Sequence, residues 1–299
     1  MSKVISATAP CSFGVWYPDG SPAGTGYISF LDYTSQAGYK TIELGPVGYL
    51  PTDTAELEQE LSKRNLSVCA GTICYAFDQY TCFADFKDNI DDLCKRLVAF
   101  GAKYIVTMDE SDVGMYSEKK QHFTKEMYHK FFDMFKEMGA YTQSVYGIET
   151  IFHPHVKSIV ETEQEIYDLM AYTGLNLCFD IGHHTLANGE ARANDTTALD
   201  FLVKNKDRIV YLHFKNLDLD LFKKIKAENL DTDTAFDIGV MGKLDEGVVS
   251  YEKLKQILDD INFTGIGVIE QDVPKATPQA AFELAQHNLK YLTQIGIVG

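Results

Sequence analysis

The sequence predicts one α/β domain, a (β/α)8 TIM barrel spanning residues 1–299, and three observations favour this fold. Eight short apolar runs alternate with helical patterns from one end of the chain to the other. A length of 299 residues is ordinary for one α/β barrel. No linker, repeat or low-complexity segment divides the chain. An open, doubly wound sheet is the main alternative to a closed barrel.

Runs rich in β-branched and aromatic residues are the expected strands. In chain order they are Cys11–Tyr17, Lys40–Gly45, Ser67–Cys74, Lys103–Met108, Tyr146–Phe152, Asn176–Asp180, Ile209–Phe214 and Gly265–Gln271. Helical patterns with an apolar stripe lie between them. Examples are Leu57–Leu61, Leu93–Leu97, Met127–Met138 and Leu254–Ile261, and a closing helix is expected near Pro278–Leu292.

Glycines stand just before several expected strands, where the last turn of a helix needs a residue that tolerates positive φ. They are Gly101, Gly139, Gly174 and Gly265. One connection, residues 217–249, is long, charged and punctuated by glycine. It is either a lid over the site or a surface insertion that carries a short helix, and both interpretations stay open.

The net charge of the chain limits the kinds of molecule that it can bind. The chain has 43 acidic and 27 basic residues, a net charge of −16, and no basic stripe, which excludes nucleic acid. A small neutral polyol or sugar suits this balance better than an anionic substrate. We expect no membrane segment and no secretory signal. The six cysteines are scattered without a CxxC pair, which favours reduced thiols and a cytoplasmic location. The aromatic content permits a homo-oligomer.

Polar residues are expected at the C-terminal ends of the last four strands, which face the active site in a TIM barrel. They are Glu149, Asp180, His213 and Glu270. Taken singly, each could be an ion-pair partner or a histidine of the core. Together they form a hard, oxygen-rich ligand set that the barrel brings to one point. We therefore expect a divalent metal, Mn²⁺ or Co²⁺, with Mg²⁺ or Zn²⁺ as alternatives.

Several stretches are similar to known sequences. The Glu/Asp/His/Glu series, with the spacing Asp180-Ile-Gly-His183, resembles the xylose-isomerase-like superfamily of TIM barrels. Nearly the whole chain, in colinear order, resembles the inosose (2-keto-myo-inositol) dehydratase branch. The stretches that carry this resemblance are Ala9–Trp16, Ile42–Pro51, His153-Pro154-His155 with Glu161-Thr162, Cys178–His184, His213-Phe214-Lys215 and Glu270-Gln271-Asp272.

The resemblance implies that the four strand-end residues hold the metal and that His183 contacts a substrate hydroxyl. Other side chains would line the same cavity: His153, His155, His184 and Lys215. From the expected strand ends, Glu43 is a contact to substrate or support for the site, with a structural ion pair as the alternative. Trp16 is a pocket wall or a packing residue. Two stretches depart from the family pattern, Asn216 for its usual Asp and 241–247 for its Pro-Gly-x-Gly turn, and they leave the substrate in doubt.

The resulting hypothesis is a metal-dependent lyase that dehydrates inosose to a trihydroxycyclohexane dione in inositol catabolism. A metal that binds a ketone oxygen stabilises the enolate formed when the neighbouring proton leaves. The catalytic candidates are Glu149, Glu270 and His183. The alternative is a metal-dependent sugar isomerase or 3-epimerase, which shares this first step. A non-catalytic sugar-binding protein is the third interpretation, and three buried carboxylates argue against it.

Overall fold

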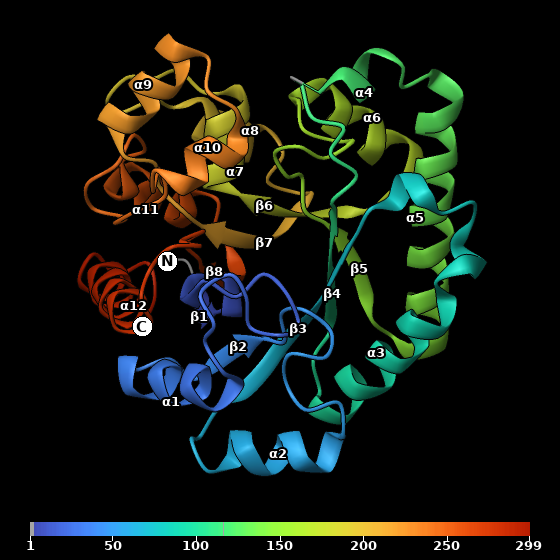
Figure 1. Cartoon of the computed structure of the whole chain (residues 1–299), viewed down its shortest axis with the longest axis horizontal. Coiled ribbons are helices and arrows are strands. Elements are labelled where there is room, and N and C mark those ends of the chain that lie inside the picture. The colour runs from blue at the N-terminus through green and yellow to red at the C-terminus, as the bar shows by residue number, and fades with distance from the viewer. Residues whose placement is uncertain (1–2, 116) are drawn as a thin grey trace.

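Eight parallel strands close into a barrel in the computed structural model, which describes residues 3–115 and 117–299 (Figure 1). Each strand pairs with the next in chain order, and β8 returns to pair with β1. The strands are β1 (Lys3–Thr8), β2 (Thr41–Glu43), β3 (Ser67–Tyr75), β4 (Tyr104–Asp109), β5 (Glu149–Phe152), β6 (Asn176–Asp180), β7 (Ile209–Phe214) and β8 (Thr264–Ile269). The predicted TIM barrel is confirmed, and the open sheet is excluded.

Helices surround the barrel (Figure 1). The α-helices are α1 (Tyr27–Ala37), α2 (Thr54–Ser62), α3 (Lys87–Phe100), α4 (Glu118–Gln121), α5 (Lys125–Tyr146), α6 (Glu163–Thr173), α7 (Ile181–Asn188), α8 (Thr197–Lys204), α9 (Leu219–Glu228), α10 (Thr232–Asp237), α11 (Tyr251–Asp260) and α12 (Pro278–Gln294). The 3-10 turns are η1 (Pro10–Phe13), η2 (Phe77–Gln79) and η3 (Phe83–Asp85). Several helices begin at a capping side chain, as α2 does at Asp53 and α6 at Thr162.

The first strand lies earlier than predicted. Cys11–Tyr17 is not a strand, because Pro10 begins the turn η1 and Gly14 ends it at φ 70°. The apolar character of this run comes from burial of a turn, with the ring of Phe13 packed 5.3 Å from that of Phe30 in α1. An apolar run alone does not separate a strand from a buried turn.

The fifth strand begins later than predicted, because the helix before it is longer. α5 continues through Gly139, where the absence of a Cβ lets the Leu175 side chain approach the backbone. The helix ends at Gly147, whose φ of 68° allows its N–H to bond the carbonyls of Gln143 and Thr142. β5 therefore starts at Glu149 rather than at Tyr146. Gly265, predicted to precede the last strand, lies inside β8.

Among the described residues, two apolar clusters form the core. One fills the barrel interior with mostly small residues: Ala7, Ala9, Cys69, Ala70, Val106, Ile151, Cys178, Tyr211 and Val268. The other lies between the barrel and its helices. The interior cluster closes the barrel beneath the C-terminal ends of the strands, so polar residues at those ends stand on an apolar floor.

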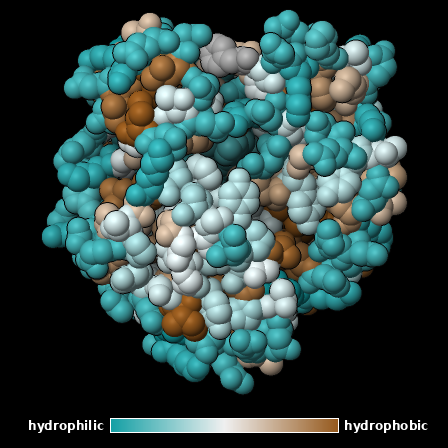
Figure 2. All heavy atoms as spheres, viewed as in Figure 1, coloured by the Kyte–Doolittle hydropathy of each residue, from teal (hydrophilic) through white to brown (hydrophobic). Residues whose placement is uncertain are grey.

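The long connection after β7 contains α9 and α10. Phe236 of α10 is buried, and its ring meets that of Trp16 at 6.0 Å, so this insertion covers part of the C-terminal face of the barrel. Movement of 217–249 as a lid stays a prediction. Within residues 3–115 and 117–299, no helix is both long and apolar enough to span a bilayer. The face seen in Figure 2 is mostly hydrophilic, with separate hydrophobic patches.

Candidate active site

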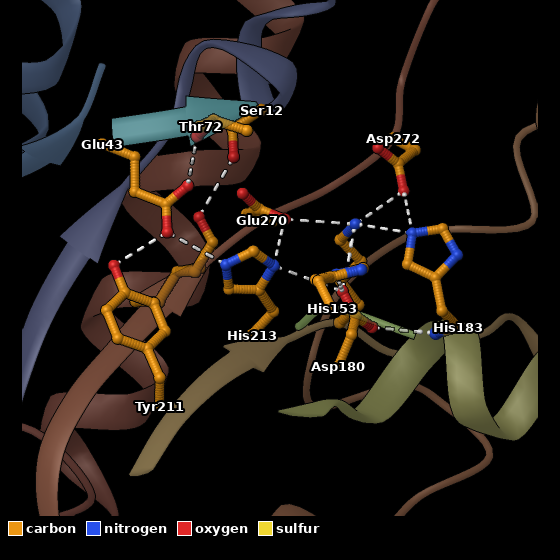
Figure 3. Close-up of polar contacts among 12 residues, drawn as sticks. Ser12, Glu43, Thr72, His153, Asp180, His183, Tyr211, His213, Glu270 and Asp272 are labelled. Atoms are coloured by element: carbon orange, nitrogen blue, oxygen red, sulfur yellow. Dashed lines mark hydrogen bonds and ion pairs between the residues drawn. The ribbon is translucent and has the colours of Figure 1, made fainter. Parts of the chain in front are cut away.

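Polar side chains from five strands converge at the C-terminal end of the barrel (Figure 3). Glu43 and Asp180 are the last residues of β2 and β6, and His213 is the penultimate residue of β7. His153 and Glu270 directly follow β5 and β8. All five are buried. Because the strands are parallel, their ends meet at one rim, and this rim gathers the cluster.

A cavity of about 440 Å³ opens above this cluster. Glu43, Glu270 and Lys215 are among the residues that line it. Trp16 and Phe236 contribute aromatic walls. Apolar walls with a few converging polar groups are typical of small-molecule sites.

His213 is held between carboxylates on its two sides. Its Nε2 lies 3.0 Å from Oε1 of Glu43 in hydrogen-bonding geometry. Its Nδ1 lies 2.9 Å from Oε2 of Glu270 and 3.6 Å from Oδ2 of Asp180. Nδ1 nevertheless has no hydrogen-bond partner among the described residues. The ring therefore directs Nε2 at Glu43 and turns Nδ1 toward the other two carboxylates.

His153 extends the same row of donor atoms. Its Nε2 lies 3.3 Å from Oδ2 of Asp180. The other oxygen of Asp180, Oδ1, accepts the N–H of His183 at 2.8 Å and caps the start of α7, which fixes the carboxylate. Four donor atoms thus follow one another at 3.3, 3.6 and 2.9 Å, and they belong to His153, Asp180, His213 and Glu270.

Lys215 brings a buried cation to this row. Its Nζ lies 3.1 Å from Oδ2 of Asp180 and 3.1 Å from Oε2 of Glu270. It donates to Asp272 Oδ2 at 2.8 Å, and it lies 2.9 Å from Nε2 of His183. The ammonium group therefore bridges the strand-end carboxylates and a second pair formed by Asp272 and His183.

Burial and neighbouring charges shift the titration of these groups. Burial alone would raise the pKa of Glu270, but the charges of His213 and Lys215 outweigh it and lower the pKa to about 2. Burial opposes charge on Lys215 as well, yet the adjacent carboxylates keep its pKa well above the usual range. Burial lowers the pKa of His153 to about 4 and of His183 to about 3. Glu270 is thus ionised, Lys215 is charged, and these two imidazoles are neutral near pH 7.

The donor set fits a divalent cation. Glu43, Asp180, Glu270 and Asp272 are four buried carboxylates, and Lys215 is the buried lysine among them. Carboxylates away from water need compensating positive charge, and Lys215 and His213 together supply fewer cations than this cluster has carboxylates. Ligands about 2.1 Å from an octahedral ion and at right angles stand about 3 Å apart. The consecutive spacings of 3.3, 3.6 and 2.9 Å between the donor atoms of His153, Asp180, His213 and Glu270 lie near this value.

The sequence pattern shared by xylose isomerase-like TIM barrel proteins matches residues 31–295. The chain belongs to this family. Inosose dehydratase of Bacillus licheniformis is 27% identical over 93% of this chain and 92% of its own length. Inosose dehydratase of Geobacillus thermodenitrificans is 26% identical over 98% and 97% of the two chains.

Solved structures share the fold at lower identity. The IolI protein with a bound zinc atom is 14% identical, with a TM-score of 0.71 over 98% of both chains. The probable 3-DHS dehydratase AsbF from Bacillus anthracis is 14% identical, with a TM-score of 0.68 over 98% of this chain and 99% of the other. D-allulose 3-epimerase from Methylomonas sp. is 14% identical, with a TM-score of 0.66 over 98% of both chains. Family membership thus fixes the barrel, while the site chemistry comes from this chain's own residues.

Glu149 does not join the cluster, and its predicted place at the end of the fifth strand is wrong. It is the first residue of β5, at the N-terminal end of the barrel, where Asn176 donates to its Oε1 at 2.8 Å. The residue that β5 presents at the other end is His153. A parallel strand carries its first and last residues to opposite rims, so Glu149 lies away from the other three predicted ligands.

His184 is also misplaced by the prediction. Its ring packs 5.1 Å from that of Phe179 and 4.8 Å from that of Phe201, on the helix side of the barrel wall. Phe179 and Asp180 are neighbours on β6, and neighbouring residues of a strand face opposite sides of the sheet. Asp180 faces the site, so Phe179 faces the surrounding helices. His184 therefore packs between β6 and α8 and does not line the cavity.

The remaining predicted residues lie at or beside the cavity. His155 lines it, and its ring centroid lies 3.9 Å from that of His183. The sequence interpretation assigned no role to Tyr211, Thr72 or Asp272, although all three contact the cluster. Tyr211 and His213 stand two residues apart on β7, so both face the barrel interior, and this alternation is the signal that could have identified Tyr211.

Proposed function

We propose that this chain is a metal-dependent carbon–oxygen lyase that removes water from 2-keto-myo-inositol and forms a trihydroxycyclohexane dione. Curated relatives named inosose dehydratase align over 92% and 97% of their own lengths, which supports this substrate. The cavity offers no free cation for an anionic substrate among its described lining residues, since Lys215 is paired with Asp272 and Lys157 with Asp233. A neutral polyol suits these walls.

The proposed ligands of the metal are His153, Asp180, His213 and Glu270, with His153 in the place predicted for Glu149. A divalent cation held there would polarise the substrate ketone and make the neighbouring C–H acidic. Mn²⁺ and Co²⁺ are the proposed ions, because two imidazoles beside two carboxylates form a borderline donor set. Zn²⁺, which the related IolI structure contains, and Mg²⁺ are the alternatives.

The observation that carries the proposal is the contact between a carboxylate and an ammonium. Glu270 Oε2 and Lys215 Nζ lie 3.1 Å apart at the edge of the cavity. Removal of water needs a base for the C–H proton and an acid for the departing hydroxyl on the next carbon. One face of the cavity therefore offers both groups within reach of adjacent carbons.

Each proton in the proposed reaction has a defined place. Glu270 accepts the proton of the hydroxyl-bearing carbon beside the ketone, and the electron pair of the broken C–H bond gives an enolate. The C–O bond on the next carbon then breaks as the ketone re-forms and a C=C bond forms between the two carbons, and Lys215 Nζ gives the leaving hydroxyl the proton that makes it water. The resulting enol becomes the dione when its hydroxyl proton moves to carbon. Glu270 returns its proton to Lys215 across their 3.1 Å contact. Asp272 and His183 hold the Lys215 side chain in place.

A turnover assay on 2-keto-myo-inositol tests this proposal. Metal-stripped protein should be inactive, and growth of the ultraviolet absorbance of the dione should return with Mn²⁺ or Co²⁺. Glu270→Gln and Lys215→Met should each lower kcat by about 10²-fold or more, the usual contribution of a positioned acid or base. Glu149→Gln is the matched control, a carboxylate removed from the opposite rim, and should retain turnover.

Two results would overturn the dehydratase. One is full activity after the metal is removed. The other is the absence of turnover on inosose by protein that has its metal bound. If the same protein then converts a ketose or aldose to its isomer or 3-epimer, it is a sugar isomerase or 3-epimerase.

A further inference from the structure

Glu43 is saturated by hydrogen bonds beneath the site (Figure 3). Its Oε1 accepts the hydroxyl of Tyr211 at 2.8 Å and faces Nε2 of His213 at 3.0 Å. Its Oε2 accepts the hydroxyl of Thr72 at 3.3 Å. Glu43 is 2% exposed, and Tyr211 is fully buried. A buried carboxylate needs such donors, and here all of them come from residues of the barrel wall.

Glu43 could instead bind the ion directly, since Glu43, His213 and Glu270 bring donor atoms within 4.8 Å of one another. The hydrogen bonds argue against this. A ligand role for Oε1 would set it in competition with the Tyr211 hydroxyl and the N–H of His213. The nitrogen of His213 that faces Glu270 and Asp180 is Nδ1, on the other side of the ring. Glu43 therefore lies behind His213 as seen from the proposed ion.

The position of Tyr211 on β7 brings its hydroxyl to the Glu43 carboxylate. It lies two residues before His213 on β7, so both side chains enter the barrel from the same strand. Its hydroxyl contacts Glu43 and, at 3.3 Å, the thiol of Cys69. Its ring packs edge-on to that of Tyr104 at 5.5 Å. The contact with Tyr104 fixes the orientation of the Tyr211 ring, and this orientation directs the Tyr211 hydroxyl toward Glu43.

We propose that Tyr211 and Glu43 are positioning residues that set the tautomer and orientation of His213 for metal binding. The inference rests on the metal site of the proposed function. Glu43 accepts the Nε2 proton, which leaves Nδ1 as the ligand atom, and the carboxylate charge makes the imidazole a stronger base. Tyr211 holds Glu43 in that orientation. A partner behind a metal-binding histidine is typically worth a factor of about 10–100 in metal affinity.

The test compares metal affinity in single-atom and near-isosteric variants. Tyr211→Phe removes only the hydroxyl, and Glu43→Gln keeps an oxygen acceptor but removes the charge. Tyr104→Phe is the matched control, a neighbouring tyrosine whose ring touches Tyr211 without a hydrogen bond to Glu43 among the described contacts. Dissociation constants for Zn²⁺ and Mn²⁺ come from competition with a chromophoric chelator. The visible spectrum of the Co²⁺-loaded protein reports the ligand set.

Tyr211→Phe and Glu43→Gln should weaken binding of both ions by about 10–100-fold. Glu43→Leu, which leaves no acceptor, should weaken it further than Glu43→Gln. Tyr104→Phe should bind like the wild type. The Co²⁺ spectrum of Tyr211→Phe and Glu43→Gln should keep the wild-type band positions, because no ligand has been removed. Thermal unfolding of the metal-free proteins checks that each variant is folded.

Unchanged affinity in Tyr211→Phe and Glu43→Gln, with tight binding by the wild type, would refute the positioning role and leave the metal site standing. A Co²⁺ spectrum altered only in Glu43→Gln would make Glu43 a ligand and refute the role as well. If Tyr211→Phe is unfolded, the metal affinity of Glu43→Gln alone tests the positioning role. Failure of the wild type to bind any ion would overturn the metal site and this inference together.

Discussion

Asn216 joins the barrel to the long insertion, and we predict that replacing it by aspartate lowers the stability of the fold. Its Nδ2 donates to the carbonyls of Leu244 and Val249, both at 2.9 Å. Its Oδ1 accepts the N–H groups of Leu217 and Val249, both at 3.0 Å. The side chain is 1% exposed. Gly247 belongs to the same junction, because a Cβ there would lie 2.1 Å from Asn216 Cγ.

Asn216→Asp keeps the two bonds that the side chain accepts and removes the two that it donates. Each lost bond is worth about 1 kcal/mol, and a carboxylate oxygen facing two carbonyl oxygens in a buried site adds a desolvation penalty of similar size. We expect the free energy of unfolding to fall by about 3 kcal/mol. The unfolding entropy of a 299-residue chain is about 0.6 kcal/mol per kelvin, so Tm should fall by about 5 °C.

Differential scanning calorimetry measures this change, and hydrogen exchange locates it. Amide exchange of Leu217 and Val249 should accelerate, since their N–H groups bond the altered side chain. Asn194→Asp makes the same chemical change at an exposed position and should alter Tm by less than about 1 °C. Equal Tm values for Asn216→Asp and the wild type would show that the carboxamide is not what anchors the insertion.

Three further outcomes are expected. Glu149→Gln should leave both the metal dissociation constant and kcat within about twofold of wild type, and a 100-fold loss in either would return Glu149 to the site. Burial lowers the pKa of His184 to about 4, so the neutral ring stabilises the fold above pH 6.5 and this stability is lost as pH falls toward 4. His184→Phe should therefore keep turnover and, in denaturant titrations between pH 7 and 4, lose about 3 kcal/mol less stability than wild type. Trp16→Ala should raise KM for inosose more than it lowers kcat in steady-state kinetics, because the indole forms a wall of the cavity.

Hydrophobic periodicity was enough to predict most of the barrel. The sixth and seventh strands begin and end at the predicted residues, because both are short, nearly uninterrupted apolar runs that end in a charged or aromatic side chain. β1 escaped prediction for the opposite reason. Its sequence is KVISAT, and the residue that faces the crowded barrel interior is Ala7, so little hydrophobic signal remains. Hydrophobic periodicity indicates which residues are buried. A strand whose buried residues are small therefore gives only a weak hydrophobic pattern.

The candidate site was predicted where a strand boundary was right and missed where it was wrong. Asp180, His213 and Glu270 follow from their strands. The error at Glu149 began at Gly139, which was taken as the end of a helix although it lies within α5. Glycine inside a helix is explained here only by the close approach of Leu175, a contact between distant segments that no local pattern contains. The boundary error moved the predicted ligand from one rim of the barrel to the other.

The cluster also shows why single-residue arguments undervalue such sites. Lys215 follows His213 by two residues, and its role depends on Asp180, Glu270 and Asp272, which come from β6 and from the loop after β8. Each carboxylate separately would be costly to bury, and together they make the site selective for positive charge. Lys215 and His213 balance only part of that charge, so a cation held by the proposed ligands would complete the balance. We expect metal binding and the orientation of Lys215 to be coupled for this reason.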